Sequence, residues 1–180
     1  MTVRLRDGLP FLRERAARAV LNEAFRAAKE RFGMRLTQFS VQGNHIHLIV
    51  EAEDREALSK GMQGLMIRIA RKLNRLWKRR GRVFADRYHL RVLKSPREVR
   101  NALRYVLQNG VKHRFVRPGR MDPFASGRWF RGWRDTFPLL ISDHPIDIFF
   151  RPVAEACTWL LKVGWRRAGG PLSLSACPAH

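Results

Sequence analysis

The sequence predicts an α+β fold of the ferredoxin-like type, with an antiparallel sheet of four strands and two helices on one face. In four short stretches apolar residues alternate with polar ones, which is the period of a strand. In the long stretches between them apolar residues recur every three or four positions, which is the period of a helix. The resulting order, βαββαβ followed by another helix, is typical of the ferredoxin-like arrangement.

The first strand is expected over residues 2–6, where Val3 and Leu5 alternate with arginines. The first helix is expected from Pro10 to Phe32, with Gly33 ending it. Residues 35–42 and 44–51 alternate again and are joined at Gly43, so they are expected to form a hairpin.

Asp54 is expected to cap a second helix that runs to about Arg80 and carries many arginines and lysines. A fourth strand is expected over 87–93, with Tyr88, Leu90 and Val92 facing the core. The motif 95-SPRE-98 is a capping box with proline at the first helical position, so a third helix begins at Pro96.

These strands share one polar face, and the first and third are expected to be central. The members of that face are Arg4, Arg6, Gln38, Ser40, His45, His47, Arg87, His89 and Arg91. After His113 prolines and glycines interrupt the chain, which favours a core over 1–115 and a basic, aromatic extension over 116–180. In this extension a last helix is expected over about 153–167 and a disordered tail from about 169.

Composition limits the possible functions. The 180 residues are 45% hydrophobic, enough for a real core, yet no apolar run approaches the ~20 residues of a membrane span. The N-terminal residues lack the apolar block of a secretory signal, and two late cysteines, Cys157 and Cys177, supply neither a disulfide framework nor a cysteine metal site. We therefore expect a cytoplasmic protein.

The net charge of +21 predicts a polyanionic partner, because such self-repulsion is costly without one nearby. Nucleic acid is the favoured partner. A membrane surface is the weaker alternative, because the basic residues are not confined to one amphipathic helix.

His45 and His47 stand two residues apart on one face of the third strand. Two imidazoles at this spacing can bind one divalent ion, or they can simply form hydrogen bonds on an open sheet face. On the third helix Tyr105 and Asn109 are one turn apart and project in nearly the same direction, away from the apolar stripe. An exposed tyrosine with a solvated asparagine is the alternative there.

The segments QGNHIHLIVE, 84–109 and the tryptophan-rich C-terminal part together resemble the HUH-type single-tyrosine transposases of the IS200-like family, most closely the REP-associated ones. The resemblance implies that His45 and His47 bind the metal, that Tyr105 is the nucleophile, and that Asn109 completes the metal site, with Gln108 as a conceivable substitute. It also implies cleavage and rejoining of single-stranded DNA beside short hairpins, through a 5′-phosphotyrosine, by a protein associated with the bacterial nucleoid.

A phenol is a poor nucleophile at neutral pH and needs help from a cation or a base. Neutral N and O ligands without a carboxylate would hold Mg²⁺ or Mn²⁺ weakly, with a DNA phosphate as a further ligand. One tyrosine makes one covalent bond per site, so cutting two ends needs two subunits or two rounds. A homodimer and a monomer both remain open.

DNA contacts beyond the site are expected from basic residues that hold phosphates and from aromatic residues of 128-RWFRGWRDTF-137 that stack on unpaired bases. The alternatives are a solvated basic face and packing of these aromatics on the core. The expected contacts are Arg4, Arg6, Arg87, His89, Arg91, Arg104, Lys112, Arg128, Trp129 and Trp133.

Two rival functions are a non-catalytic nucleic-acid-binding protein on a ferredoxin-like sheet and an HUH protein that nicks DNA for replication. The first expects stacking Phe or Tyr residues on the open face, where this chain has His, Arg and Gln. Against the second, the chain is short and shows no helicase-like segment.

Overall fold

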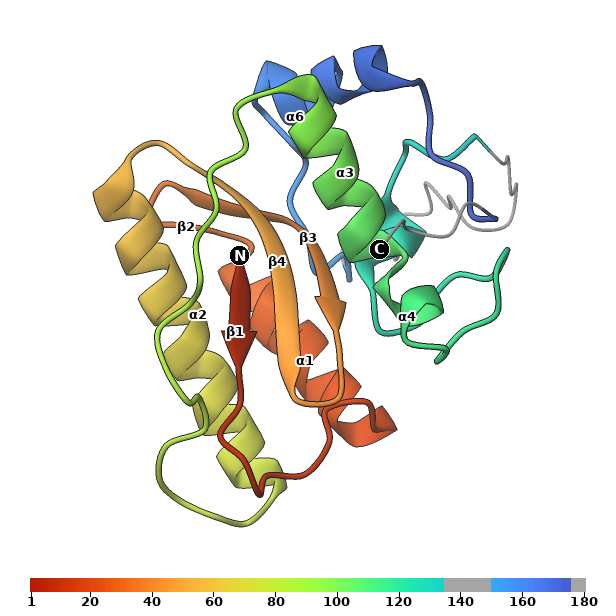
Figure 1. The fold of residues 1–180 in the computed structure, drawn as a ribbon. Coiled ribbons are helices and arrows are strands. Elements are labelled where there is room, and N and C mark those ends of the chain that lie inside the picture. Colours follow the sequence, from red (N-terminus) through yellow and green to blue (C-terminus); the bar gives the residue numbers. More distant parts are fainter. Residues whose placement is uncertain (135–149, 176–180) are drawn as a thin grey trace.

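The computed structural model describes residues 1–134 and 150–175, and it confirms the mixed α+β class (Figure 1). The antiparallel sheet has the order β1-β4-β3-β2. Its strands are β1 (Thr2–Arg4), β2 (Glu30–Arg31), β3 (Met34–Val41) and β4 (His45–Ala52). The predicted third strand, β4, is central as expected, between β1 and β3. The predicted first strand, β1, ends the sheet order, and beyond it residues 84 and 89 form only isolated bridges with residues 5 and 2.

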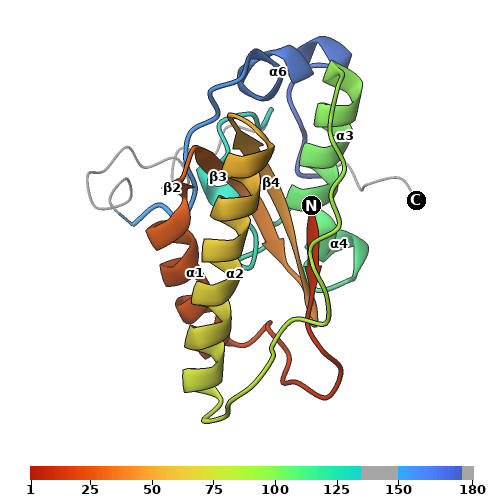
Figure 2. The same cartoon turned by 90° about the vertical axis from the view of Figure 1, so that its left-hand side faces the viewer.

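Helices cover both faces of the sheet. On one face lie α1 (Arg15–Ala28) and α2 (Arg55–Leu76), which pack side by side, and on the other lies α3 (Pro96–Leu107) (Figures 1 and 2). The Asp54 side chain caps α2 by accepting from Ala57 N, and Ser95 caps α3 by accepting from Glu98 N, as the sequence predicted. The β3–β4 part of the sheet therefore lies between two helical layers.

The first helix is shorter than predicted. It begins at Arg15 instead of Pro10, because Leu12 is fully buried and its N–H donates to Gly43 O in the hairpin turn. It ends at Ala28, after which Glu30 and Arg31 pair with the start of β3. The turn between these strands is made by Phe32 and Gly33, both at positive φ. The spacing of apolar residues does not show whether the end of a predicted helix will instead pair with a strand that is distant in the sequence.

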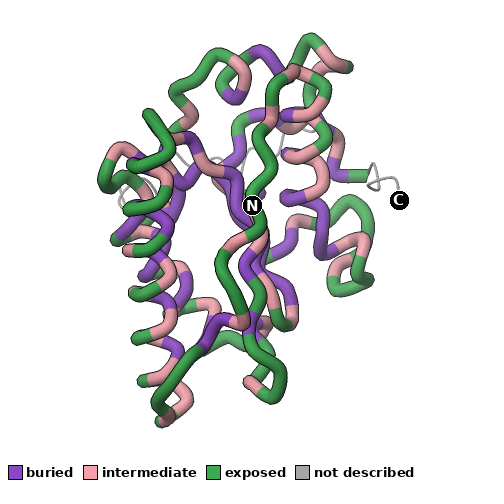
Figure 3. Tube along the Cα trace, turned by 60° about the vertical axis from the view of Figure 1, so that its left-hand side comes forward, coloured by how far each residue is buried: buried purple, intermediate pink, exposed green. Residues whose placement is uncertain are grey.

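The predicted fourth strand is displaced. Residues 83–89 pair with β1, and the exchange of hydrogen bonds between His89 and Thr2 at 3.0 and 2.9 Å ends the pairing. Leu90 and Val92 were expected in the core, but both are exposed, and they line a cavity beside α3. Val83 and Phe84 are buried instead. Figure 3 shows the exposed course of this segment between α2 and α3.

The polar face of β3 is buried by the C-terminal extension. Gln38, Ser40 and Gln42 are at most 7% exposed. Ser126, in the 3-10 helix η1 (Ser126–Trp129), donates to Gln38 Oε1 at 2.6 Å and accepts from Phe39 N at 2.9 Å. The prediction of an open polar sheet face is therefore wrong on the β3 side.

The rest of the described extension packs against α3. The predicted helix over 153–167 is two short pieces, α6 (Trp159–Lys162) and the 3-10 helix η2 (Gly164–Ala168), separated at Val163, where φ is -137° and not helical. The Trp159 ring packs on Gly164, where a Cβ would come within 2.6 Å of it. The tail predicted to be disordered is ordered as far as it is described, since Leu172 is buried and its N–H donates to Gly132 O. Its last residues, 176–180, lie outside the described residues.

Within the described ranges, no helix has both the length and the apolarity needed to cross a lipid bilayer.

A buried ion pair ties the extension to the N-terminal part of the fold. Arg13 donates to both carboxylate oxygens of Asp122, at 2.8 and 2.9 Å, and also to Val41 O. The Asp122 side chain is 1% exposed. This contact fixes the segment that carries Ser126 over the end of β3.

We predict that Arg13→Met lowers the free energy of unfolding by about 3–5 kcal/mol, because it leaves the buried Asp122 carboxylate unpaired. Arg4→Met removes an exposed ion pair with Asp7 and should cost at most about 1 kcal/mol. Chemical denaturation of both variants measures the difference. Equal losses would show that the Arg13 pair does not organise the fold.

Candidate active site

The two histidine rings converge at the start of β4, in the interior of the sheet. His45 Nε2 and His47 Nε2 are 3.1 Å apart, and the ring planes are nearly perpendicular. Two donors bound side by side to an octahedral ion at about 2.1 Å would be about 3 Å apart. The spacing of the two nitrogens therefore fits one shared cation.

Hydrogen bonds to the far side of each ring orient the pair. His45 Nδ1 lies 3.0 Å from Asn44 Oδ1, and His47 Nδ1 lies 2.9 Å from Thr2 Oγ1. A carboxamide oxygen only accepts, so His45 carries its proton on Nδ1 and keeps the Nε2 lone pair free. The Thr2 hydroxyl can either donate or accept, so it supports both tautomers of His47, including the one that frees Nε2 for a metal.

Both histidines are held neutral. Burial, followed by the repulsion that a protonated His45 would exert, lowers the pKa of His47 to about 3. Burial, followed by His113 and Arg4, also lowers the pKa of His45. A neutral imidazole is the form that binds a metal, so no proton has to be displaced at neutral pH.

Tyr105 approaches the histidine pair from α3, across a recess that lies between α3 and the sheet. Its hydroxyl lies 3.5 Å from His47 Nε2, and the ring centroids are 5.0 Å apart. The apolar stripe of α3, Val99, Leu103, Val106 and Leu107, is buried beneath the helix and turns Tyr105 toward the sheet. Lys112 Nζ lies 5.2 Å from the centre of the Tyr105 ring, so a positive charge stands beside the phenol.

Asn109 begins the short helix α4 (Asn109–Lys112), after a break at Gln108. It is fully buried, and neither Oδ1 nor Nδ2 has a hydrogen-bond partner among the described residues. A buried amide without partners is costly, and a bound ion would satisfy its oxygen. Gln108 Oε1 is also buried without a partner among the described residues, but Gln108 Nε2 donates to Ser173 O at 2.6 Å, which ties that side chain to the C-terminal segment. Of the two amides, Asn109 is the better candidate ligand.

Close packing holds α4 in place. A Cβ at Gly110 would come within 2.1 Å of the Asp122 carboxylate, so only glycine allows this approach. Asp122 is in turn fixed by Arg13. The described residues contain no cluster of three or more His, Cys, Asp or Glu side chains that could hold a metal. A cation here would rely on the two imidazoles, the Asn109 amide and the substrate itself.

The predicted DNA contacts fall into three groups. Arg4, Arg6, Arg87, His89 and Arg91 are exposed near the sheet edge formed by β1 and residues 83–89. Arg104 and Lys112 are half-buried on α3 and α4, and Arg128 is exposed on η1. Trp129 packs against the main core, which lies between the sheet and helices α1 and α2. Trp133 packs against a second apolar cluster, which lies between α3 and the C-terminal segment, and its Nε1 donates to Gly127 O. For these two rings the structure therefore supports the alternative, packing on the core. Residues 135–137 of the same stretch lie outside the described residues.

Sequence reasoning missed three contributors to the site. Thr2 and Asn44 orient the histidines through hydrogen bonds. The sequence could have indicated Thr2 only through the strand register that pairs it with His47. His113 lies beside the pair, with its ring centroid 6.4 Å from that of His45. A cavity of about 830 Å³ adjoins His47 and Tyr105, between β4, α3 and residues 90–93.

We predict that His47 makes the metal-free protein less stable as the pH falls. Between pH 6.5 and 3 the unfolded chain takes up a proton that folded His47 does not, so stability is lost as the pH falls through this window. From pH 7.5 to 5 the wild type should lose about 2 kcal/mol more unfolding free energy than His47→Gln. Denaturant titrations in the presence of a chelator measure this, and parallel losses would contradict it.

We predict that Asn109→Leu stabilises the metal-free protein by about 1–3 kcal/mol, because it removes a buried amide without partners. The same change should weaken Mn²⁺ binding measured by calorimetry or electron paramagnetic resonance. Gln108→Leu is the matched control, which should keep Mn²⁺ affinity while losing the bond to Ser173 O. Mn²⁺ binding that depends on Gln108 and not on Asn109 would reverse the assignment.

One of three comparisons with known proteins found a match. A protein-family model described as "Transposase IS200 like" matches residues 10–109, a range that begins before α1 and includes His45, His47, Tyr105 and Asn109. Searches of curated proteins and of solved structures returned no significant match. Since the matched range is more than half of the 180 residues, the chain belongs to the IS200-like transposase family.

Proposed function

We propose that this transposase cleaves and rejoins single-stranded DNA at hairpin-type repeats, with Tyr105 as the nucleophile and a divalent ion, Mg²⁺ or Mn²⁺, on His45, His47 and Asn109. The observation that carries the proposal is the position of the Tyr105 hydroxyl, 3.5 Å from His47 Nε2 although the residues are 58 positions apart in the chain. A phenol directed at a pair of neutral, convergent imidazoles is an arrangement that phosphoryl transfer can use.

In the proposed reaction the Tyr105 oxygen attacks the scissile phosphorus. A bond forms between this oxygen and phosphorus, and the bond from phosphorus to the 3′ oxygen breaks. The phenol loses its proton to solvent and the 3′ oxygen gains one, which leaves a 5′-phosphotyrosine and a free 3′-OH. Attack by a 3′-OH on the phosphotyrosine reverses the step, so the energy of the phosphodiester is kept and no ATP is needed.

A bound divalent ion would supply charge stabilisation at the scissile phosphate. His45 and His47 contribute neutral nitrogens for it, and their hydrogen bonds to Asn44 and Thr2 keep these nitrogens aimed at one point. Lys112 Nζ, 5.2 Å from the centre of the Tyr105 ring, would add a positive charge beside the phosphate under attack.

The recessed position of the site favours a single strand over a duplex. His47 is 7% exposed and Asn109 is fully buried, so a phosphate must enter between α3 and the sheet to reach them. A flexible single strand can bend into such a recess, whereas a stiff duplex cannot. The net charge of +21 supplies the attraction for the DNA backbone.

The non-catalytic alternative is disfavoured by the buried polar face of β3. A binding module on a ferredoxin-like sheet needs an open face where bases can stack. Here Ser40 and Gln42 lie under the extension and are at most 1% exposed. Instead, access to the sheet is concentrated at the histidine pair.

We predict that incubation with a labelled single-stranded oligonucleotide and Mn²⁺ gives a protein–DNA adduct that survives denaturation. Tyr105→Phe should abolish the adduct, and His45→Ala or His47→Ala should reduce its rate at least about 100-fold, because the scissile phosphate loses its charge stabilisation. The substrates are oligonucleotides that carry the hairpin repeats of the host genome.

Tyr88→Phe is the matched control, because Tyr88 is the only other tyrosine in the sequence and packs against the main core between the sheet and helices α1 and α2. It should form the adduct at the wild-type rate. An adduct that persists in Tyr105→Phe, or DNA binding without any adduct on every host repeat, would refute the proposed chemistry.

A further inference from the structure

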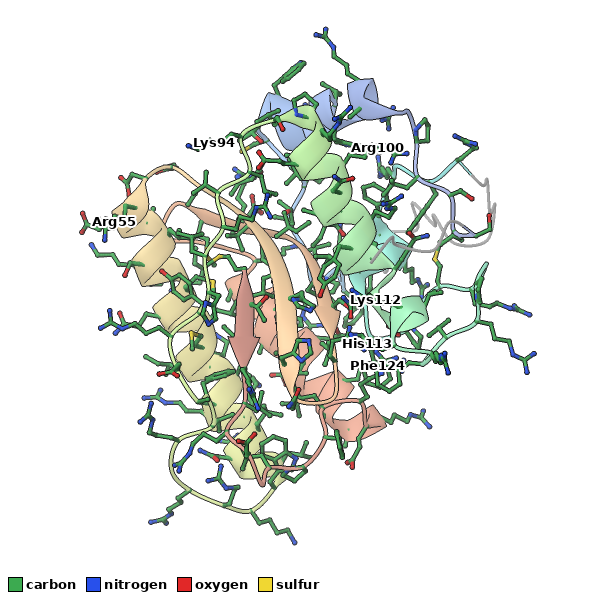
Figure 4. All side chains as sticks on the ribbon, in the orientation of Figure 1. Arg55, Lys94, Arg100, Lys112, His113 and Phe124 are labelled. Carbon is green, nitrogen blue, oxygen red and sulfur yellow. The ribbon has the colours of Figure 1, made fainter. Side chains whose placement is uncertain are left out.

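A row of aromatic rings leads away from the histidine pair toward solvent. The ring of His45 lies 6.4 Å from that of His113, and the ring of His113 lies 6.2 Å from that of Phe115. His113 is exposed, and Phe115 is 52% exposed. Figure 4 shows Lys112 and His113 beside Phe124, where α4 approaches the hairpin end of β3 and β4. The row therefore begins at the proposed metal ligand and ends on the surface.

A second exposed phenylalanine lies at the same end of the sheet. Phe11 is 69% exposed, and its ring covers Gly43, where a Cβ would come within 2.8 Å of the ring. Gly43 lies in the turn that leads into His45. Phe11 and Phe115 are thus large apolar side chains held at the surface near the reacting centre, which folding alone does not favour.

Phe115 is fixed in place although it is exposed. The Arg13 guanidinium lies 4.3 Å from the centre of the Phe115 ring and 4.5 Å from that of the Phe124 ring. Arg13 itself is held by Asp122 and Val41 O. One side of the Phe115 ring is therefore supported and the rest is accessible, as in a preorganised binding surface.

Basic residues alternate with these rings. The segment 112-KHRFVRPGR-120 carries Lys112, Arg114, Arg117 and Arg120, and the last three are exposed. Aromatic rings interleaved with arginine and lysine fit a ligand that has flat bases and phosphates in alternation. Trp129 and Trp133, the rings that the sequence suggested for stacking, are partly buried and pack against the core, so they offer less ring surface than Phe11 or Phe115.

We propose that His113, Phe115 and Phe11 form a stacking track for unpaired bases of the single strand on one side of the scissile phosphate. The proposal rests on the proposed function for the position of that phosphate, but stacking itself needs neither the tyrosine nor the metal. The exposed arginines of 112–120 would hold the phosphates between the stacked bases. Binding along the track would place the strand across His45 and into the recess.

The experiment measures DNA binding without cleavage. Full-length Tyr105→Phe protein is titrated, in the presence of a chelator, into a fluorescein-labelled oligothymidylate of 15 nucleotides. Adding Phe115→Ala should weaken binding about tenfold, and adding Phe11→Ala should weaken it further. Phe115→Trp should restore affinity, because the indole stacks, whereas Phe115→Leu should behave like Phe115→Ala although it keeps apolar contact with Arg13.

Phe32→Ala is the control for exposed aromatic surface. Phe32 is 54% exposed and lies beside the start of β3, whereas the track lies at its other end, about 20 Å away for a strand of this length. Its affinity should not change. Salt titrations separate stacking from charge: Phe115→Ala should keep the slope of log affinity against log salt, and Arg117→Ala should reduce it by about 0.7.

A direct readout of stacking comes from replacing single thymidines with 2-aminopurine. Its fluorescence should be quenched on binding at one or more positions, and Phe115→Ala should relieve that quenching. Leucine as good as tryptophan at position 115, or no loss of affinity in Phe115→Ala and Phe11→Ala, would overturn the track. Thermal unfolding of each variant shows whether a loss of affinity follows from a loss of fold. If Phe115→Ala unfolds, the difference in DNA affinity between Phe115→Leu and Phe115→Trp tests stacking in its place.

Adduct formation by the protein with Tyr105 intact, assayed separately, distinguishes the two proposals. An adduct in the wild type together with unchanged binding by Phe115→Ala would reject the track alone. Weaker binding by Phe115→Ala together with no adduct on any host repeat would reject the proposed chemistry alone.

Discussion

The contact between His45 Nε2 and His47 Nε2, at 3.1 Å inside the protein, is the constraint on which the rest of the site depends. Two ring nitrogens at this distance are stable only if one of them carries a proton or a cation lies between them. Burial opposes a second proton on His47, and the hydrogen bond to Asn44 directs the His45 proton to the far nitrogen. Without a metal, neutral His47 can donate its Nε2 proton to His45 Nε2 while Thr2 donates to His47 Nδ1. In the proposed metal site, the proton of His47 would move to Nδ1 and Thr2 would accept it.

The C-terminal extension contributes to the site although it supplies none of the central side chains. Its Asp122 holds Arg13 and, through the close approach at Gly110, fixes the helix that begins with Asn109. Ser126 in the same segment covers the polar side of β3. The proposed site, which would use a phenol, an amide and two imidazoles, needs rigid support from several directions. The extension provides it from the side that a bare ferredoxin-like core leaves open.

Charge and aromatic surface have separate parts in DNA binding. The net charge of +21 attracts any polyanion and has no preference for sequence or strand number. In the proposed mode of binding, the recess between α3 and the sheet would select for flexible DNA, and the exposed rings near His45 would select for unpaired bases. Selectivity for single strands would then arise from shape and stacking, whereas affinity would arise mainly from charge.

The sequence by itself determined which residues form strands and helices where periodicity was strong and local, as in β3, β4 and the capped starts of α2 and α3. It also placed His45 and His47 on one face, because this relation follows from strand geometry alone. The prediction that Tyr105 and Asn109 share one helix is wrong, because α3 ends at Leu107 and Asn109 begins α4. Tertiary structure decided where α1 begins, which residues pair with β1 in place of the strand predicted over 87–93, and which aromatic rings are exposed. Those features depend on partners distant in the chain, such as Gly43 for Leu12, Thr2 for His89 and Arg13 for Phe115, and local periodicity carries no information about distant partners.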